Sequence, residues 1–345
     1  MCYVVCYSDD WEAHATSKDF LWKVFKRLNK HIKCNMTAKP GATEWTYLGM
    51  DRKLSIDKEG NRSILLNMPN YIDKLQQQFA HLVNDRRVHI PVPAGLHTSI
   101  KDPTPSGENP ESLKTPLLRL YGSLLWSYRS CFPALGCGLH LISRRLSNPT
   151  LEVWDAAVQM LNWVIQRRSK GITFSSVANS TLQAYSDAGG KPESGTGRIL
   201  AGHFIRLLGA SLSTTSKKLA LLSTSTACSE YLSLSRTAKS VKHFRDLVLE
   251  LECEEHITPG KTPIWSDSSV ACRMATTDIQ SRTLYLDLEY HFARQANESF
   301  AAIRHIPGSQ LPADTLSKAL ARQLFERFEP YLTGDKTGEP SELPR

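Results

Sequence analysis

The chain has 345 residues, 41% of them hydrophobic, which is too long for one ordinary core and predicts two or three domains. No stretch approaches the roughly 18 to 20 apolar residues of a membrane span, and Asp9 and Asp10 interrupt the N-terminal apolar run too early for a signal peptide. The formal charge of +8 favours a polyanionic partner such as a nucleic acid. We therefore expect an intracellular protein, in the cytoplasm, the nucleus or both, with no membrane partner and with its eight cysteines reduced, because they form no CxxC pair.

The N-terminal part of the chain predicts short strands and helices. Residues 1–12 read as an apolar strand that ends in a turn at Asp9 and Asp10. Two adjacent carboxylates at a strand end suit a hard divalent cation, although an Asp-Asp pair alone is more often only a turn. The later elements are a helix over residues 18–32, two strands around a turn at residues 58–60, and a helix over residues 71–82.

The rest of the chain divides into four segments. Residues 90–116 are rich in Pro, Gly, Ser and Thr and predict a linker, and residues 117–175 predict a small helical module. Residues 176–330 predict antiparallel strands followed by an alternation of strands and helices, which indicates an α/β (α+β) fold with a mixed sheet and flanking helices. Residues 331–345 predict a disordered tail. The strands of this sheet are expected at residues 182–186, 199–208, 218–223, 263–266 and 301–306, and a last helix at residues 313–328.

Glu230 lies near the start of a strongly amphipathic helix. Ser225 or Thr226 is expected to cap this helix, and apolar residues then recur at steps of three and four from Leu234 to Leu251. The pattern places Glu230 in the first turn. An acid there would complement the helix dipole, and taken alone this is the simpler interpretation.

Three aspartates share this kind of position and favour a metal site. Asp187 and Asp267 each follow an apolar strand, and Asp314 opens the last predicted helix. If the first two strands are neighbours, their ends lie about 5 Å apart and both acids reach a shared ion. Carboxylates packed so closely repel one another unless divalent cations neutralise them, and that is the arrangement of two-metal phosphodiester hydrolysis.

A series of short motifs then resembles copia-type LTR retrotransposon polyproteins, in order and spacing, over nearly the whole chain. The resemblance implies the C-terminal part of a reverse transcriptase palm over residues 1–89, a thumb-like helical module and a ribonuclease H-like domain over residues 176–330. The motifs are Tyr7-Ser8-Asp9-Asp10, Tyr47-Leu48-Gly49-Met50, Tyr71-Ile72-Asp73-Lys74-Leu75, Tyr121-Gly122-Ser123-Leu124, Asn148-Pro149 with Trp154, Ser216-Lys217-Lys218, Leu222-Ser223-Thr224 with Ser229-Glu230-Tyr231, Tyr290-His291-Phe292 and Ala313-Asp314.

The resemblance also implies roles for six acids. Asp187, Glu230, Asp267 and Asp314 match the ribonuclease H carboxylates, which bind Mg²⁺ or Mn²⁺ and cleave RNA in an RNA/DNA hybrid. Asp9 and Asp10 match the paired metal-binding aspartates of the polymerase. The implied partners are the hybrid and a primer-template duplex, and the oligomeric state stays open. Polymerase activity from this chain alone is not expected, because an upstream metal-binding aspartate and the fingers are missing from it.

Several departures from the family pattern keep a second hypothesis open. Cys228 stands where an acid is usual, Ala188-Gly189-Gly190 replaces an acid and a Trp, and Ser268-Ser269 replaces an Asn-Gln pair. The alternative to a ribonuclease H is therefore a non-catalytic nucleic-acid-binding remnant of a decayed retroelement. His305 precedes Asp314 and is a candidate to assist product release, or is simply a buried or solvated histidine.

Overall fold

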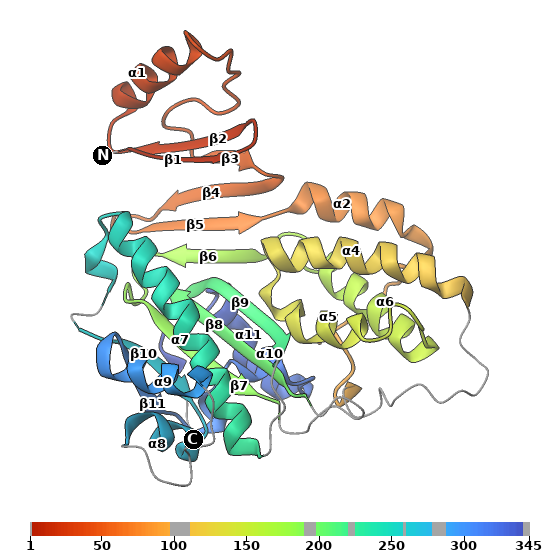
Figure 1. The fold of residues 1–345 in the computed structure, drawn as a ribbon. Coiled ribbons are helices and arrows are strands. Elements are labelled where there is room, and N and C mark those ends of the chain that lie inside the picture. Colours follow the sequence, from red (N-terminus) through yellow and green to blue (C-terminus); the bar gives the residue numbers. More distant parts are fainter. Residues whose placement is uncertain are drawn as a thin grey trace.

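The computed structural model of the chain describes residues 2–96, 111–189, 198–219, 225–257, 260–277 and 288–340. Within these ranges the strands form three sheets, of two, four and five strands (Figure 1). Most of the linker predicted at residues 90–116, and residues 220–223 of the predicted strand at 218–223, lie outside the described residues. No helix in the described ranges is long and apolar enough to cross a membrane.

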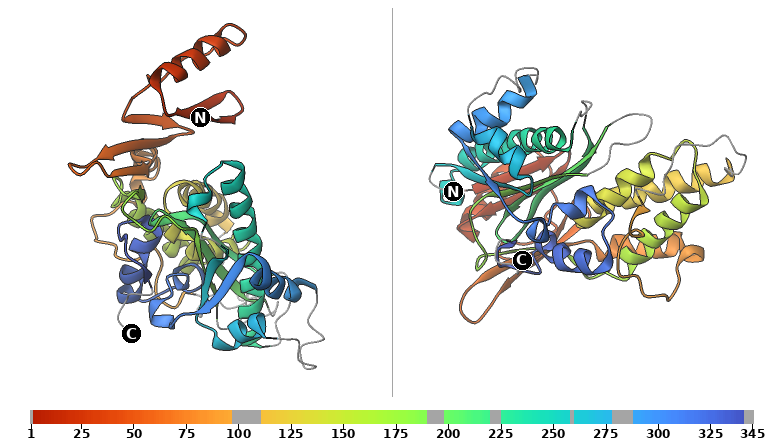
Figure 2. Two further views of the ribbon diagram at one scale, coloured as in Figure 1. Left: turned by 90° about the vertical axis from the view of Figure 1, so that its left-hand side faces the viewer. Right: turned by 90° about the horizontal axis from the view of Figure 1, so that it is seen from below.

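The N-terminal sheet is a hairpin of β1 (Cys2–Tyr7) and β2 (Asp10–Ala15), followed by α1 (Lys18–Asn29). The Ser17 side chain caps α1 by accepting a hydrogen bond from the Phe20 amide, as expected for a serine at this position. None of the residues of α1 is buried. Figure 2 shows the hairpin and α1 projecting from the remainder of the molecule.

The second sheet joins segments that are far apart in the sequence. Its order is β3 (Glu44–Tyr47), β4 (Met50–Ile56), β5 (Arg62–Asn67) and β6 (Gly171–Ser175), all antiparallel. The sequence predicted two strands around the turn at residues 58–60, but this segment forms three, β3, β4 and β5. The additional turn is at Leu48 and Gly49, which both lie in the left-handed region with φ of 50° and 74°. Since β6 pairs with β5, the N-terminal strands and the helical module share structure across the predicted boundaries.

The helical module contains α4 (Lys114–Ser130), α5 (Gly136–Ser143) and α6 (Leu151–Ile165), and α2 (Pro69–Gln78) packs against it. Ile72 and Leu75 of α2 share one apolar core with Leu117, Met160 and Trp163 of the module. Short 3-10 helices occupy Ala80–Leu82, Glu111–Leu113, Pro133–Leu135, Glu254–His256 and Gly308–Gln310. The residues predicted as a palm and those predicted as a helical module therefore share one apolar core and one sheet.

The third sheet is mixed, which confirms the predicted fold class. Its order is β11 (Ala301–His305), β10 (Thr262–Ser266), β7 (Gln183–Ala188), β8 (Leu200–Leu207) and β9 (Ala210–Lys218). The pairs β7 with β8 and β8 with β9 are antiparallel, whereas β10 is parallel to both β7 and β11. The long helix α7 (Thr226–Glu250) crosses the sheet, with α8 (Ser269–Thr276) and α9 (Leu288–Ser299) beside it (Figure 1).

The C-terminal residues differ from the expectation. The predicted helix at residues 313–328 is two helices, α10 (Asp314–Ser317) and α11 (Arg322–Thr333). Residues 331–340 pack against the sheet and are not a disordered tail: the buried Arg206 guanidinium donates hydrogen bonds to the carbonyls of Lys336, Thr337 and Gly338. A buried guanidinium needs such acceptors, and the tail supplies them.

Candidate active site

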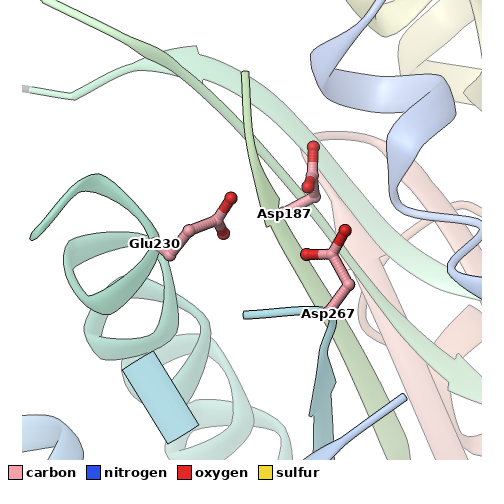
Figure 3. A group of neighbouring side chains, drawn as sticks. All are labelled: Asp187, Glu230 and Asp267. Carbon is pink, nitrogen blue, oxygen red and sulfur yellow. The ribbon is translucent and has the colours of Figure 1, made fainter. Parts of the chain in front are cut away.

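Three of the predicted carboxylates converge at one end of the five-stranded sheet. One carboxylate oxygen each from Asp187, Glu230 and Asp267 lies within 4.8 Å of the others. Figure 3 shows the three side chains pointing into a common gap, Glu230 from α7 and the two aspartates from adjacent strand ends. Asp187 is fully buried and Glu230 is 7% exposed.

The register of β7 and β10 explains why the two aspartates meet. Tyr185 of β7 pairs with Trp265 of β10, and the strands are parallel. Asp187 and Asp267 each come two residues after that pair, so both side chains leave the same edge of the sheet on the same face. The sequence predicted this proximity on the condition that the strands are neighbours, and they are.

The local structure of α7 fixes Glu230. Ser225 caps the helix, as predicted, by accepting a hydrogen bond from the Cys228 amide at 3.2 Å. The helix begins at Thr226, so Glu230 lies beyond its first turn and accepts a hydrogen bond from the Ala188 amide at 3.1 Å. One turn further on, the Ser233 hydroxyl donates to the Asp187 carbonyl at 2.9 Å. Glu230 thus faces the end of β7 and not the helix terminus, which rules against the helix-dipole interpretation.

Asp314 lies beside this group but is linked to it through a lysine. The Lys318 ammonium is 2.8 Å from Asp314 Oδ1 and 3.2 Å from Asp187 Oδ1. The Ser317 hydroxyl donates to the other oxygen of Asp187. This segment sits close over the sheet because residue 202, opposite Asp187 in β8, is a glycine: a Cβ there would lie 2.7 Å from the Leu316 backbone.

The electrostatics of the site are those of crowded, buried acids. Burial raises the pKa of Glu230 to about 9, and the charges of Asp187 and Asp267 contribute further. Burial, followed by the charge of Asp187, likewise raises the pKa of Asp267 and brings that of Asp314 to about 7. Burial disfavours the Lys318 ammonium, but the neighbouring charges of Asp187 and Asp314 outweigh it and raise its pKa.

The donor set fits a hard divalent cation. All the converging atoms are carboxylate oxygens, the ligands that Mg²⁺ and Mn²⁺ prefer. Burial raises the pKa of the neighbouring Cys272 thiol to about 12, and this thiol is not part of the converging group. Cys228, where the family pattern has an acid, is buried in the apolar core that packs between α7 and the sheet.

Asp9 and Asp10 are not part of this group. Both are exposed at the turn of the β1–β2 hairpin, on a different part of the molecule (Figure 1). Among the described residues, no third acid or histidine joins them in a group that could hold an ion. His305 lies next to the site, with its ring Nε2 3.1 Å from the Asp267 carbonyl oxygen.

Sequence reasoning missed the residues that organise Asp187 and Asp314. Lys318 and Ser317 follow Asp314 by four and three residues, and the same i,i+4 spacing occurs in the exposed pair Lys242 and Asp246. This spacing predicts that the Lys and Asp side chains are in contact, but it does not tell whether the pair is buried in a site or exposed at the surface. Gly202 is marked only as a glycine within a strand, which is a recognised sign of close backbone approach.

Comparisons with known proteins find similarity to Pol polyproteins of mobile elements. It is 25% identical over 270 residues, 77% of its length, to the retrovirus-related Pol polyprotein from transposon TNT 1-94 of Nicotiana tabacum. It is 27% identical over 198 residues to the Pol polyprotein from transposon RE2 of Arabidopsis thaliana. The chain resembles copia-type retrotransposon Pol polyproteins. It spans 20% and 13% of the lengths of these two relatives, and no family model matches it.

Two solved structures align with parts of the chain at low TM-scores. The compost metagenome enzyme LC11-RNase H1 aligns over 40% of this chain and 92% of its own, with 19% identity and a TM-score of 0.30. The foamy viral protease-reverse transcriptase, in complex with dsDNA, aligns over 88% of this chain and 55% of its own, with 14% identity and a TM-score of 0.42.

Proposed function

We propose that this copia-type segment is a metal-dependent ribonuclease that hydrolyses the RNA strand of RNA/DNA hybrids. The observation that carries the proposal is the convergence of Asp187, Glu230 and Asp267 within 4.8 Å at one sheet edge. Such a cluster of buried acids is destabilising without cations, so its presence in a Pol-type sequence is best explained by a role in binding them.

The side chains divide the work as follows. Asp187, Glu230 and Asp267 hold Mg²⁺ or Mn²⁺ through their carboxylate oxygens. Asp314 is a fourth acid beside them, paired with Lys318. When bound, the metal activates water and stabilises the developing charge on the leaving oxygen of the phosphodiester. Before metal binds, the Ala188 amide holds the Glu230 carboxylate by a hydrogen bond, and the Ser317 hydroxyl and the Lys318 ammonium hold that of Asp187.

The substrate class follows from the resemblance and from the charge. A hybrid presents phosphates and, on one strand only, 2′-hydroxyls, so a protein reads it by shape and backbone contacts. The net charge of +8 suits such a partner. Polymerase activity is not proposed, because Asp9 and Asp10 lie exposed and, among the described residues, no third acid or histidine joins them to hold an ion.

The test is cleavage of an end-labelled RNA/DNA hybrid by the full chain with Mg²⁺. Asp187→Asn is expected to lower the rate by at least about 100-fold, because even the outer partners of metal ligands contribute 10- to 100-fold. Asp10→Asn is the matched control and leaves the rate unchanged. Equal rates for the native chain and Asp187→Asn sink the proposal. Salt-sensitive binding of the hybrid without any cleavage supports the non-catalytic remnant instead.

A further inference from the structure

Lys318 occupies a particular place among the four acids. Its ammonium lies between Asp187 and Asp314, 3.2 Å and 2.8 Å from one oxygen of each. The Lys318 side chain is 32% exposed, whereas those of Asp187 and Asp314 are 0% and 13% exposed. The ammonium is thus an internal counterion with one side toward solvent.

The fold builds this placement from the backbone. Lys318 directly follows α10, and its amide donates to the Asp314 carbonyl at 2.9 Å. The preceding residues, Leu316 and Ser317, lie so close to Gly202 of β8 that no side chain fits at position 202. The Ser317 hydroxyl also holds the second oxygen of Asp187. The position of the ammonium is therefore set by packing on the sheet as well as by attraction to the acids.

The charges around the site are unevenly compensated. Within the described part of the chain, Lys318 is the only cation at ion-pair distance from any of the four acids, and it contacts Asp187 and Asp314 alone. Glu230 and Asp267 are not at ion-pair distance from Lys318, and they form with Asp187 the group within 4.8 Å (Figure 3). Asp187 is thus paired with a positive charge and also grouped with two further acids that have no such partner among the described residues.

We propose that Lys318 serves as a fixed cation on the Asp187–Asp314 side of the site, so that the chain without substrate binds a single divalent ion through Asp187, Glu230 and Asp267. This rests on the proposed function, since it concerns the same carboxylates. A divalent ion needs oxygens at about 2.1 Å and excludes an ammonium from the same gap, and the two cations also repel each other. A second ion between Asp187 and Asp314 therefore requires the ammonium to leave.

The test counts ions by titrating the metal-free full chain with Mn²⁺, followed by calorimetry and by the Mn²⁺ EPR signal. The native chain is expected to bind one ion. Lys318→Gln is expected to bind a second, and to bind the first about 10- to 100-fold more tightly, because a nearby positive charge has been removed. Lys318→Arg keeps the charge and should behave like the native chain. Lys242→Gln is the matched control, since Lys242 pairs with Asp246 at the same i,i+4 spacing on an exposed face of α7.

A second readout separates a charge effect from a fold defect. Without metal, Lys318→Gln is expected to melt at a lower temperature than the native chain, and Mn²⁺ is expected to raise its melting temperature more than that of the native chain. Lys318→Met, which keeps the apolar stem, replaces the Gln variant if that one does not fold.

Two outcomes overturn the role of Lys318 while leaving the nuclease intact. One is identical stoichiometry and affinity in the native chain and in Lys318→Gln or Lys318→Met. The other is binding of two ions by the native chain with the lysine in place. If neither protein binds Mn²⁺ and the native chain does not cleave the hybrid, the proposed function itself fails.

Discussion

The N-terminal hairpin and the five-stranded sheet contain similar short sequences, but these are exposed in the hairpin and buried in the sheet. In both regions a short strand is followed by aspartate, Asp9 and Asp10 after β1 and Asp187 at the end of β7. Every residue of β7 is buried, but in β1 Val4 and Val5 are 44% and 52% exposed. The hairpin forms a two-stranded sheet of its own that projects from the molecule (Figure 2), whereas α7 and α10 pack against β7.

The pKa values of the acids in the two regions differ because one region is exposed and the other is buried. The Ser8 hydroxyl, by hydrogen bonding, lowers the pKa of the exposed Asp9 carboxyl, while burial raises that of Glu230 to about 9. An acid after a strand becomes a candidate metal ligand only when a neighbouring strand end and a covering helix bring further acids to it. The sequence motif alone does not make the site.

Hydrogen exchange should give the largest contrast between the two regions. Amides of residues 183–188 in β7 are expected to exchange only by global opening, because they lie in a buried central strand. Amides of residues 2–15 are expected to exchange at least about 1,000-fold faster, since a two-stranded sheet with an exposed face opens locally. Exchange followed by mass spectrometry of peptides from the two segments measures the difference.

The adjacent strand β8 is the internal control and should be protected like β7. Strong protection of residues 2–15 would show that the hairpin is covered in solution and would remove the contrast. The hairpin does have anchors: the Tyr3 hydroxyl donates to the Leu251 carbonyl and Glu12 pairs with Arg52, so its protection is expected to be weak and not zero.

Two arginines allow the same comparison between a buried and an exposed ion pair. Arg206 is 2% exposed, pairs with Glu339 and donates to four backbone carbonyls, among them that of Gly209. Arg206→Met is expected to lower the free energy of unfolding by about 3 kcal/mol, because it leaves buried acceptors unpaired. Arg168 pairs with Asp73 at the surface, and Arg168→Met should cost no more than about 1 kcal/mol.

Urea unfolding of both variants, monitored by circular dichroism, checks this prediction. Equal losses for the two variants would mean that the C-terminal residues 334–340 do not hold to the sheet through Arg206. Limited proteolysis gives an independent reading, since Arg206→Met should release the C-terminal end for cleavage and Arg168→Met should not.

Sequence patterns identified the elements whose apolar period is clear. The strands at β7, β8, β10 and β11 and the helix α7 with its Ser225 cap were all predicted, and they carry Asp187, Glu230 and Asp267. Their residues are buried on one or both faces, and such residues follow the period of the element. Convergence of the three acids followed once the strands were assumed to be neighbours.

Elements held by polar contacts escaped prediction. β9 was expected at residues 218–223 but spans Ala210–Lys218, because its run of Ser and Thr has no apolar alternation and pairs with β8 through backbone hydrogen bonds. The packing of residues 334–340 depends on Arg206, more than 120 positions away. Lys318 likewise acquires its place beside Asp187 only because the preceding residues, Leu316 and Ser317, pack closely over Gly202. Long-range polar contacts leave no periodic signal in a sequence.

The pH dependence of stability should also differ between the regions. The pKa of Glu230 is about 9 in the folded chain against an ordinary 4.5, so between these values the folded state keeps a proton that the unfolded state releases. This contribution to stability is complete below pH 4.5 and is lost as pH rises through 9. In EDTA between pH 6.5 and 8, it should lower the free energy of unfolding by about 1.4 kcal/mol per pH unit.

Glu230→Gln should remove most of that slope, and Mg²⁺ should flatten it in the native chain by compensating the ionised acids. Asp57→Asn in the exposed N-terminal turn is the control. The Asn61 side chain lowers the pKa of Asp57, so its contribution is present above pH 3.8 and disappears only as pH falls. Denaturant melts at pH 6.5, 7.2 and 8 measure the slopes, and an unchanged slope in Glu230→Gln would show that burial does not hold this carboxyl protonated.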